Sequence, residues 1–310
     1  MSVNPILQSM LTQMNTLLPV FDENTDIDAL RAPMLPESTL ASKLKLGSVK
    51  DLSISLDQRD VAIRVYRPDN AASPLPLLVY FHGGGWVLGS LDSHDAVCRI
   101  LCDSTNAVVV SVDYRLAPEH PFPAAVHDGF DVLAWCQQNA QQIGVDPNKI
   151  AVIGDSAGGN LAAVMALKAR DETGPSLCAQ VLIYPVTDTD FTRPSYVDNA
   201  EGYFLTTAAM QWFWDKYTGD GSDRNHPYAA PIKASLDNLP PAMVITAGYD
   251  PLRDEGIAYA EKLKAAGVEV SERAVDDAIH GFIGFSDFYP AAREVLAEIS
   301  NWLNQCFNKA

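Results

Sequence analysis

The chain has little positive charge for its length. Its 310 residues hold 22 Lys and Arg against 39 Asp and Glu, so the formal net charge at pH 7 is −17. A charge of this sign repels nucleic-acid phosphates and anionic membrane surfaces. We therefore expect no nucleic acid and no membrane among the partners, and poor attraction for anionic substrates.

Long apolar runs are also missing, although apolar residues make up 47% of the sequence. No run approaches the ~18 residues that a membrane-spanning helix needs. The first 30 residues contain no Lys or Arg, whereas a secretory signal peptide starts with positive charge. These absences predict neither a membrane span nor a secretory signal.

Cysteine is scarce. The five cysteines form an odd number without regular spacing, which favours a reducing cytoplasm over a disulfide framework. Cys98 and Cys102 are close together on a predicted helix, but no further Cys or His stands at a spacing typical of metal ligands. We expect a cytoplasmic location and no metal site.

Short apolar runs alternate with helical stretches over most of the chain. The runs are nearly continuous, which is typical of strands buried on both faces of a parallel sheet. Two alternating runs joined by polar residues come first and indicate a β-hairpin. The pattern predicts the α/β class, with an eight-stranded, mostly parallel sheet flanked by helices. The predicted strands are 49–56, 61–67, 77–81, 107–112, 150–153, 180–184, 242–247 and 268–275. The predicted helices are 4–18, 94–104, 124–142, 157–170, 253–266 and 287–307.

A serine stands between small residues directly after the fifth predicted strand. Residues 154–158, Gly-Asp-Ser-Ala-Gly, fit the pattern G-x-S-x-G. A sharp strand-to-helix turn needs such small neighbours, and it exposes the serine hydroxyl at a helix N-terminus, where N–H groups face a developing anion. Ser156 is therefore the predicted nucleophile. The alternative is a glycine-rich turn in which the serine has no role.

A glycine loop follows the third predicted strand. Residues 82–86, His-Gly-Gly-Gly-Trp, can turn several N–H groups toward one point, as an oxyanion hole requires. A phosphate-binding loop is excluded because the glycine spacing misses G-x-G-x-x-G by one residue and no Gly-Lys-Ser/Thr follows. We expect the donors among Gly83, Gly84 and Gly85, and favour the last two, with Ala157 as a further donor.

A serine nucleophile needs a base, and the base needs an acid that orients it. Asp250 follows the seventh predicted strand and His280 the eighth, and the order Ser156, Asp250, His280 is that of an α/β-hydrolase. Asp254 is the rival acid, but it lies in the first turn of a predicted helix, where the helix dipole favours any carboxylate. We therefore favour Asp250. The other histidines are expected to be structural or solvated: His82, which would hold the glycine loop, His94, His120, His127 and His226.

Five motifs stand in order between residues 82 and 282: HGGGW, DYRLAPE, GDSAGGN, DPLRD and HGF. Together they resemble the bacterial hormone-sensitive-lipase family of carboxylesterases. The resemblance implies an α/β-hydrolase fold, Ser156, Asp250 and His280 as the catalytic triad, and an oxyanion hole near the glycine loop. The mechanism needs no metal or organic cofactor.

The family carries a helical cap, formed by N-terminal helices and an insertion after the sixth strand. The resemblance assigns residues 1–45 and 186–231 to this cap, and residues 46–185 and 232–310 to the two parts of the α/β-hydrolase core. The insertion holds nine aromatic residues. We expect them to narrow an apolar pocket that accepts small-molecule esters with short to medium acyl chains. The predicted pocket residues are Trp86, Tyr184, Phe204, Phe213 and Phe282.

Three other functions fit parts of this pattern. Amide or arylacetamide deacetylation uses the same triad on a different substrate. Non-catalytic plant hormone receptors of similar fold lack the catalytic histidine, which this chain has as His280. Serine peptidases of this fold usually carry a large additional domain, for which 310 residues leave no room. We therefore predict an ester hydrolase, and association into a homodimer is left open.

Overall fold

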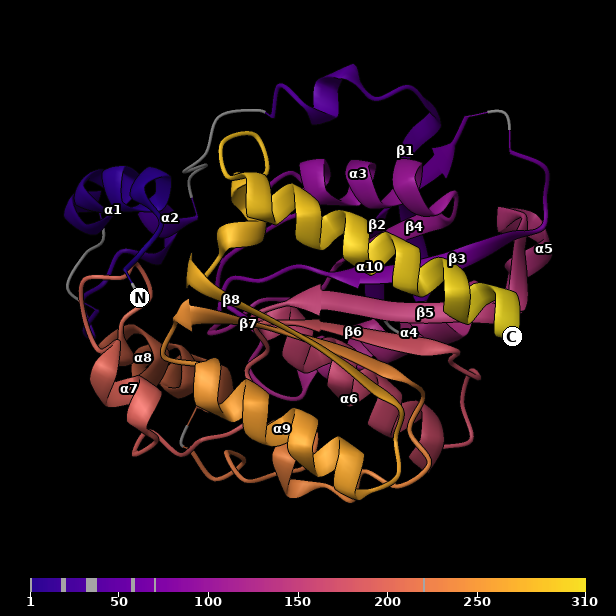
Figure 1. Cartoon of the computed structure of the whole chain (residues 1–310). Coiled ribbons are helices and arrows are strands. Elements are labelled where there is room, and N and C mark those ends of the chain that lie inside the picture. The colour runs from indigo at the N-terminus through magenta and orange to yellow at the C-terminus, as the bar shows by residue number, and fades with distance from the viewer. Residues whose placement is uncertain (1, 18–20, 32–37, 57–58, 70, 220) are drawn as a thin grey trace.

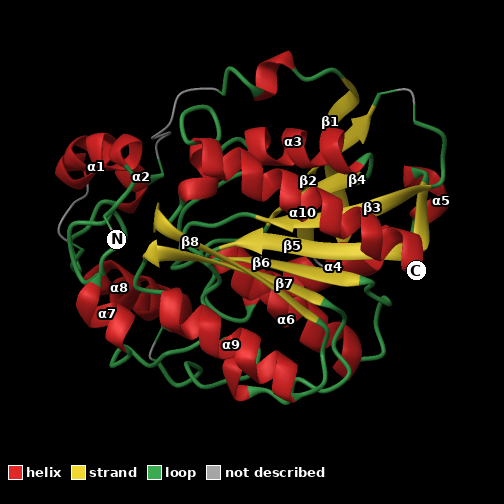
Figure 2. Ribbon diagram, in the orientation of Figure 1, coloured by secondary structure: helices red, strands yellow, loops and turns green. Residues whose placement is uncertain are grey.

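One sheet of eight strands runs through the described part of the chain, and helices cover both of its faces (Figure 1, Figure 2). The structure is a computed structural model that describes residues 2–310 except 18–20, 32–37, 57–58, 70 and 220. The strands are β1 (Leu46–Leu56), β2 (Arg59–Pro68), β3 (Leu75–Phe81), β4 (Val108–Asp113), β5 (Val145–Asp155), β6 (Ala179–Ile183), β7 (Ala242–Tyr249) and β8 (Val270–Ile279). The α/β class and the number of strands are those predicted from the sequence.

The strand order across the sheet is β1-β2-β4-β3-β5-β6-β7-β8. The pairs β1/β2 and β2/β4 are antiparallel, and all pairs from β4 onward are parallel. Because parallel strands point the same way, the residues that follow β5, β7 and β8 meet at one edge of the sheet. This topology brings together the three predicted catalytic residues, which are far apart in the sequence.

The helices lie mainly in two layers. The longer ones are α1 (Pro5–Leu17), α3 (Asp95–Thr105), α4 (Ala124–Gln138), α6 (Ala157–Asp171), α8 (Thr207–Thr218), α9 (Arg253–Ala265) and α10 (Pro290–Lys309). The shorter ones are α2 (Ile27–Leu30), α5 (Ala140–Ile143), α7 (Pro194–Asp198) and the 3-10 turns Ala41–Lys43, Pro231–Lys233 and Phe282–Phe285. None of the helices that the structure describes is long and apolar enough to cross a membrane.

The central strands contribute side chains to two apolar cores, one on each face of the sheet. In β3, Leu77 and Val79 belong to one core, whereas Leu78 and Tyr80 belong to the other, as the two-residue period of a strand requires. Helices α4, α6 and α9 cover the first core, and α3 and α10 cover the second (Figure 1). Burial on both faces explains why these strands are almost purely apolar in sequence.

The predicted helix 124–142 is broken in the structure. Helix α4 ends at Gln138 and α5 begins at Ala140, because Asn139 between them has φ −103° and ψ 18°. The carbonyl of Trp135 accepts both the backbone N–H and the side-chain amide of Asn139, each over 2.9 Å. The predicted hairpin is confirmed by the antiparallel pairing of β1 with β2. Of the four polar residues expected to join the two strands, 57–60, the first two lie outside the described residues, and Arg59 and Asp60 belong to β2.

Helices from the two predicted cap segments lie together at the carboxyl ends of the parallel strands. In Figure 1, α1 and α2 lie at the same end of the strands as α7 and α8. Trp212 of α8 donates its indole N–H to the carbonyl of Asp22 over 2.8 Å, and the rings of Phe21 and Trp212 are 5.3 Å apart. The N-terminal segment therefore packs directly on the insertion.

Residues 38–45 lie apart from these helices. The Asp287 carboxylate accepts the backbone N–H groups of Thr39 and Leu40 over 2.7 and 2.9 Å. The turn Ala41–Lys43 contacts α3, which belongs to the core of the fold. Part of the predicted N-terminal cap segment, 1–45, thus contacts Asp287 and α3.

Candidate active site

Ser156 lies on a sharp turn between β5 and α6. Its φ of 56° and ψ of −121° are strained for a residue with a side chain, and its N–H donates to the carbonyl of Ile183 over 2.8 Å. A Cβ at Gly158 would lie 2.0 Å from the carbonyl oxygen of Phe81. Only glycine fits this close approach of helix and strand, which explains the small neighbours in the motif.

Three side chains form a chain of hydrogen bonds that starts at this serine. His280 Nε2 lies 2.9 Å from Ser156 Oγ, and His280 Nδ1 lies 2.7 Å from Asp250 Oδ2. Asp250 is fully buried, and Ser156 and His280 are each 6% exposed. When Nδ1–H donates to the carboxylate, Nε2 carries a lone pair that can accept the serine proton. The arrangement can therefore activate the hydroxyl as a nucleophile.

Asp250 is fixed by the backbone around it. Its Oδ1 accepts the N–H of Leu252 over 2.8 Å, so Oδ2 is directed at His280. Its carbonyl accepts the side-chain amide of Asn199, which comes from the insertion. This contribution of Asn199 could not be predicted from the sequence, because it depends on how the insertion folds back on the loop after β7.

The rival acid Asp254 has a different role. Its Oδ2 accepts the N–H of Ser195 in α7 over 2.8 Å, and its Oδ1 accepts from Arg253. Burial opposes its ionisation, but Arg253 and the Ser195 N–H outweigh burial and hold the pKa of Asp254 below its ordinary value. The structure therefore brings Asp250, and not Asp254, to His280.

The glycine loop presents free N–H groups beside Ser156. Within the described residues, the N–H groups of Gly84, Gly85 and Ala157 have no hydrogen-bond acceptor. Gly83 is different, because its N–H donates to Asp155 Oδ1 over 3.1 Å. Including Gly83 among the expected donors was therefore wrong, since a buried carboxylate already occupies its N–H. Gly84, Gly85 and Ala157 stay candidates for the oxyanion hole.

His82 is buried beneath the glycine loop. Its ring stacks on Tyr114 with 4.3 Å between centroids, and the Tyr114 hydroxyl donates to the His82 carbonyl over 2.7 Å. Burial, followed by the nearby His94, lowers the pKa of His82 to about 4. A neutral, stacked ring fits the structural role expected for it. His94 is less remote from the site than expected, because its Nε2 lies 3.3 Å from Asp155, next to Ser156.

The predicted pocket residues fall into two groups. Phe213 and Phe204 lie against the site, because a Cβ at Gly85 would be 2.3 Å from the Phe213 ring and a Cβ at Gly281 would be 3.5 Å from the Phe204 ring. The other three are almost completely buried. They are Tyr184, whose ring is 4.7 Å from that of His280, Phe282, which packs on Tyr184, and Trp86, which stacks on Tyr217 of α8 at 4.1 Å.

A buried glutamate near the site was missed by sequence analysis. Glu255 in α9 is fully buried. Its Oε1 accepts the N–H of Thr187 over 2.6 Å and its Oε2 accepts the hydroxyl of Tyr196 over 2.9 Å, so it joins α9 to the insertion. Burial raises the pKa of Glu255 from its ordinary 4.5 to about 8, although these donors favour the ionised form.

This pKa shift makes the protein less stable as the pH rises. The folded protein keeps the Glu255 proton up to about pH 8, whereas the unfolded chain releases it near 4.5. The free energy of unfolding should therefore decrease as the pH rises from about 4.5 to about 8, by at most about 1.4 kcal/mol per pH unit. Glu255→Gln is neutral at every pH and should lose this part of the slope. Urea unfolding at pH 5, 6, 7 and 8 measures the slope, with Glu261→Gln, an exposed position on the same helix, as control. A Glu255→Gln slope equal to that of the wild type would contradict the prediction.

The chain is similar to known esterases in sequence. Residues 78–284 match the family described as alpha/beta hydrolase fold. The carboxylesterase NlhH of Mycobacterium tuberculosis is 41% identical over 297 residues, which cover 94% of this chain and 92% of that protein. An arylesterase of Saccharolobus solfataricus is 42% identical over 241 residues, which cover 77% of this chain and 78% of that one.

Solved structures give the same result. A hyperthermophilic esterase from the archaeon Pyrobaculum calidifontis superposes with a TM-score of 0.92 at 43% identity, over 98% of this chain and 99% of that one. A thermostable esterase from Pseudomonas putida has a TM-score of 0.90 at 37% identity, over 99% and 98% of the two chains. Fold, motifs and matched length agree. The chain belongs to the α/β-hydrolase family. Within that family it belongs with the carboxylesterases of the hormone-sensitive-lipase family, which its sequence motifs resemble.

Proposed function

We propose that the protein is a serine carboxylesterase that hydrolyses small esters with short to medium acyl chains. The hydrogen-bonded chain from Ser156 through His280 to Asp250 carries the proposal, since this arrangement turns a hydroxyl into a nucleophile. The names of the relatives, which include carboxylesterases and an arylesterase, support it.

The proposed mechanism has two steps. Ser156 Oγ attacks the ester carbonyl while His280 takes its proton, and Asp250 stabilises the imidazolium. The oxyanion that forms lies against the free N–H groups of Gly84, Gly85 and Ala157. His280 then gives its proton to the leaving alcohol. Water hydrolyses the acyl-enzyme with His280 again as the base, so no step needs a metal or organic cofactor.

The insertion and the N-terminal helices form the proposed cap, which limits the size of the substrate. Phe213 lies over Gly85 and Phe204 lies beside Gly281, so both rings border the space in front of Ser156. Asn15 of α1 holds the turn before Phe204, because its side chain donates to the carbonyl of Gly202 over 2.9 Å and accepts the N–H of Phe204 over 3.2 Å. The wall of the pocket is thus held from both cap segments.

Activity on p-nitrophenyl esters should therefore depend on acyl length. Each methylene that fits adds up to about 0.8 kcal/mol of binding, until the wall is reached and the gain reverses. We expect the best kcat/KM between about two and eight acyl carbons and a shift toward longer chains in Phe213→Ala or Phe204→Ala. Phe288→Ala is the control, since that ring is 52% exposed and outside the site. Ser156→Ala should be inactive on every ester.

Three outcomes would contradict parts of this proposal. Faster hydrolysis of an emulsified long-chain triglyceride than of any soluble ester would indicate a lipase. Faster hydrolysis of a matched anilide than of the ester would indicate an amidase. An unchanged length optimum in both phenylalanine variants would show that these rings do not form the wall.

We also propose that the protein works in a reducing compartment such as the cytoplasm. Cys98, Cys102, Cys136, Cys178 and Cys306 are all free thiols. Burial raises the pKa of Cys136 to about 12, which keeps this thiol protonated and unreactive. Cell fractionation with an antibody against the protein tests the location, and light scattering distinguishes a monomer from a homodimer.

A further inference from the structure

Asp155, the residue before Ser156, links the glycine loop to a histidine outside the proposed triad. Its Oδ1 accepts the N–H of Gly83 over 3.1 Å and the hydroxyl of Tyr80 over 2.7 Å. His94 Nε2 lies 3.3 Å from both carboxylate oxygens. Asp155 is 5% exposed, so its hydrogen-bond partners come mainly from the protein rather than from solvent.

The contact between Asp155 and the glycine loop is close. A Cβ at Gly83 would lie 2.4 Å from Asp155 Oδ2, so the loop backbone rests directly on the carboxylate. The N–H groups of Gly84 and Gly85, the proposed oxyanion donors, follow immediately in the chain. Any rotation of the Asp155 carboxylate therefore displaces the start of the loop that carries them.

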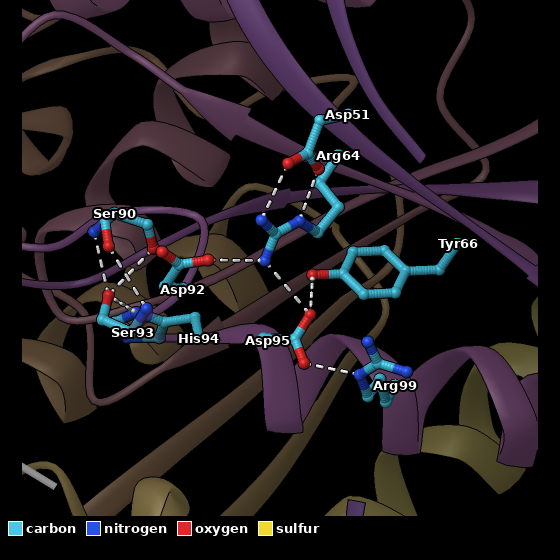
Figure 3. A network of polar contacts seen from close by, with 9 residues as sticks. All are labelled: Asp51, Arg64, Tyr66, Ser90, Asp92, Ser93, His94, Asp95 and Arg99. Atoms are coloured by element: carbon cyan, nitrogen blue, oxygen red, sulfur yellow. Dashed lines mark hydrogen bonds and ion pairs between the residues drawn. The ribbon is translucent and has the colours of Figure 1, made fainter. Parts of the chain in front are cut away.

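His94 is held on its far side by a serine turn. Ser93 Oγ lies 2.8 Å from His94 Nδ1 and donates to the carbonyl of Ser90 over 2.9 Å. Figure 3 shows Ser90, Ser93 and His94 beside the acidic side chains of Asp92 and Asp95. The position of the imidazole thus depends on the turn 90–94.

The same turn is tied to the sheet by Arg64 of β2. One guanidinium nitrogen contacts Asp92 over 2.8 Å and Asp95 over 3.3 Å, while the other two contact Asp51 of β1 (Figure 3). The hydroxyl of Tyr66, also in β2, donates to Asp95 over 2.9 Å. The support of His94 therefore rests on rigid strands rather than on the loop alone.

We propose that His94 and Asp155 are a pair of positioning residues that orients the glycine loop for oxyanion binding. The inference rests on the proposed ester hydrolysis, and neither side chain touches the reacting atoms. Donors stabilise an oxyanion only when they are directed at the position where it forms. An ionised carboxylate holds the Gly83 N–H more strongly than a neutral one. Burial opposes the ionisation of Asp155, but His94 and Tyr80 outweigh it and lower the pKa of this carboxyl.

His94→Asn tests the pair, because it removes the ring nitrogen that faces Asp155. We expect kcat for p-nitrophenyl butyrate to fall about 10- to 100-fold, with KM changed less than about twofold. A trifluoromethyl ketone adds to Ser156 Oγ and places an oxyanion in the hole. Its Ki should rise by the same factor by which kcat/KM falls. A merely structural residue would change the melting temperature without this parallel loss.

Two milder variants grade the effect. His94→Gln keeps an amide N–H that can reach Asp155, so it should recover part of kcat. Ser93→Ala changes an exposed residue and removes the partner of His94 Nδ1, so it should cause a smaller loss of the same kind. His127→Asn, at an exposed position of α4, is the matched control and should leave kcat unchanged.

The outcomes separate the pair from the proposed function. A wild-type protein that hydrolyses no ester would overturn the proposed function, and the pair with it. If the wild type is active and the kcat and Ki of His94→Asn stay within about twofold of the wild-type values, the positioning role of the pair is overturned and the proposed function is not. A loss confined to KM would do the same. If His94→Asn does not fold, Ser93→Ala decides, and unchanged kcat and Ki in that variant would overturn the proposal.

Discussion

Asp250→Asn is expected to lower kcat on p-nitrophenyl butyrate by about 10⁴-fold. The Asp250 carboxylate is fully buried and lies 2.7 Å from His280 Nδ1, so it fixes the tautomer of the ring and balances its charge when the ring takes the serine proton. An amide of the same shape can present its N–H to Nδ1, and the ring proton then sits on Nε2. A protonated Nε2 has no lone pair with which to accept the Ser156 proton. Steady-state kinetics, with folding checked by circular dichroism, measures the loss.

Asp254→Asn is the matched control for this prediction. Asp254 lies four residues later, accepts the N–H of Ser195 and pairs with Arg253, and so stabilises the start of α9. Its replacement should leave kcat nearly unchanged and cost about 1 kcal/mol of stability or less. A large loss of kcat in Asp254→Asn and a small one in Asp250→Asn would show that the wrong carboxylate has been assigned to His280.

Most of the fold could be predicted from the sequence because its strands are buried on both faces. An apolar run such as Val108–Val112 has no competing interpretation once helices flank it. The ends of the elements were harder. β5 begins at Val145, five residues before its apolar run, because Val145 already pairs with Leu75 of β3 although the residues between are mostly polar. The break at Asn139 lies in the backbone angles of one residue, which the periodicity of apolar residues does not report.

Some residues of the candidate site could likewise be predicted from the sequence, and others could not. Ser156, Asp250 and His280 could be placed because each follows a strand and the strands are parallel, so topology brings them together. His94 could not be assigned, because its contact with Asp155 joins residues that are distant in sequence and share no local pattern. Glu255 was missed for a related reason. A lone glutamate in a helix is ordinarily exposed, and only the fold shows that the insertion covers it.

Gly85→Ala is expected to lower kcat/KM by about 10²- to 10³-fold, the loss typical of one oxyanion donor. Gly85 has φ +61°, and an added Cβ would lie 2.3 Å from Cδ1 of Phe213. The alanine cannot keep this backbone position, because the Phe213 ring is itself buried and packs on the ring of Phe21 at 5.7 Å. The loop must shift, and the N–H groups of Gly84 and Gly85 turn away from the oxyanion. The Ki of a trifluoromethyl ketone should therefore rise together with the loss of activity.

Gly219→Ala separates the displacement of the loop from ordinary backbone strain. Gly219 has the same φ of +61°, but an added Cβ there meets nothing within 4 Å. Both alanines are strained by the positive φ and should lower stability, but only the one at position 85 should lose activity. The double variant Gly85→Ala/Phe213→Ala removes the clash while keeping the strain, so it should recover part of kcat/KM. Wild-type activity in Gly85→Ala would show that the Gly85 N–H is not an oxyanion donor. No recovery in the double variant would instead assign the loss to the backbone conformation at Gly85, because the contact with Phe213 would then play no part.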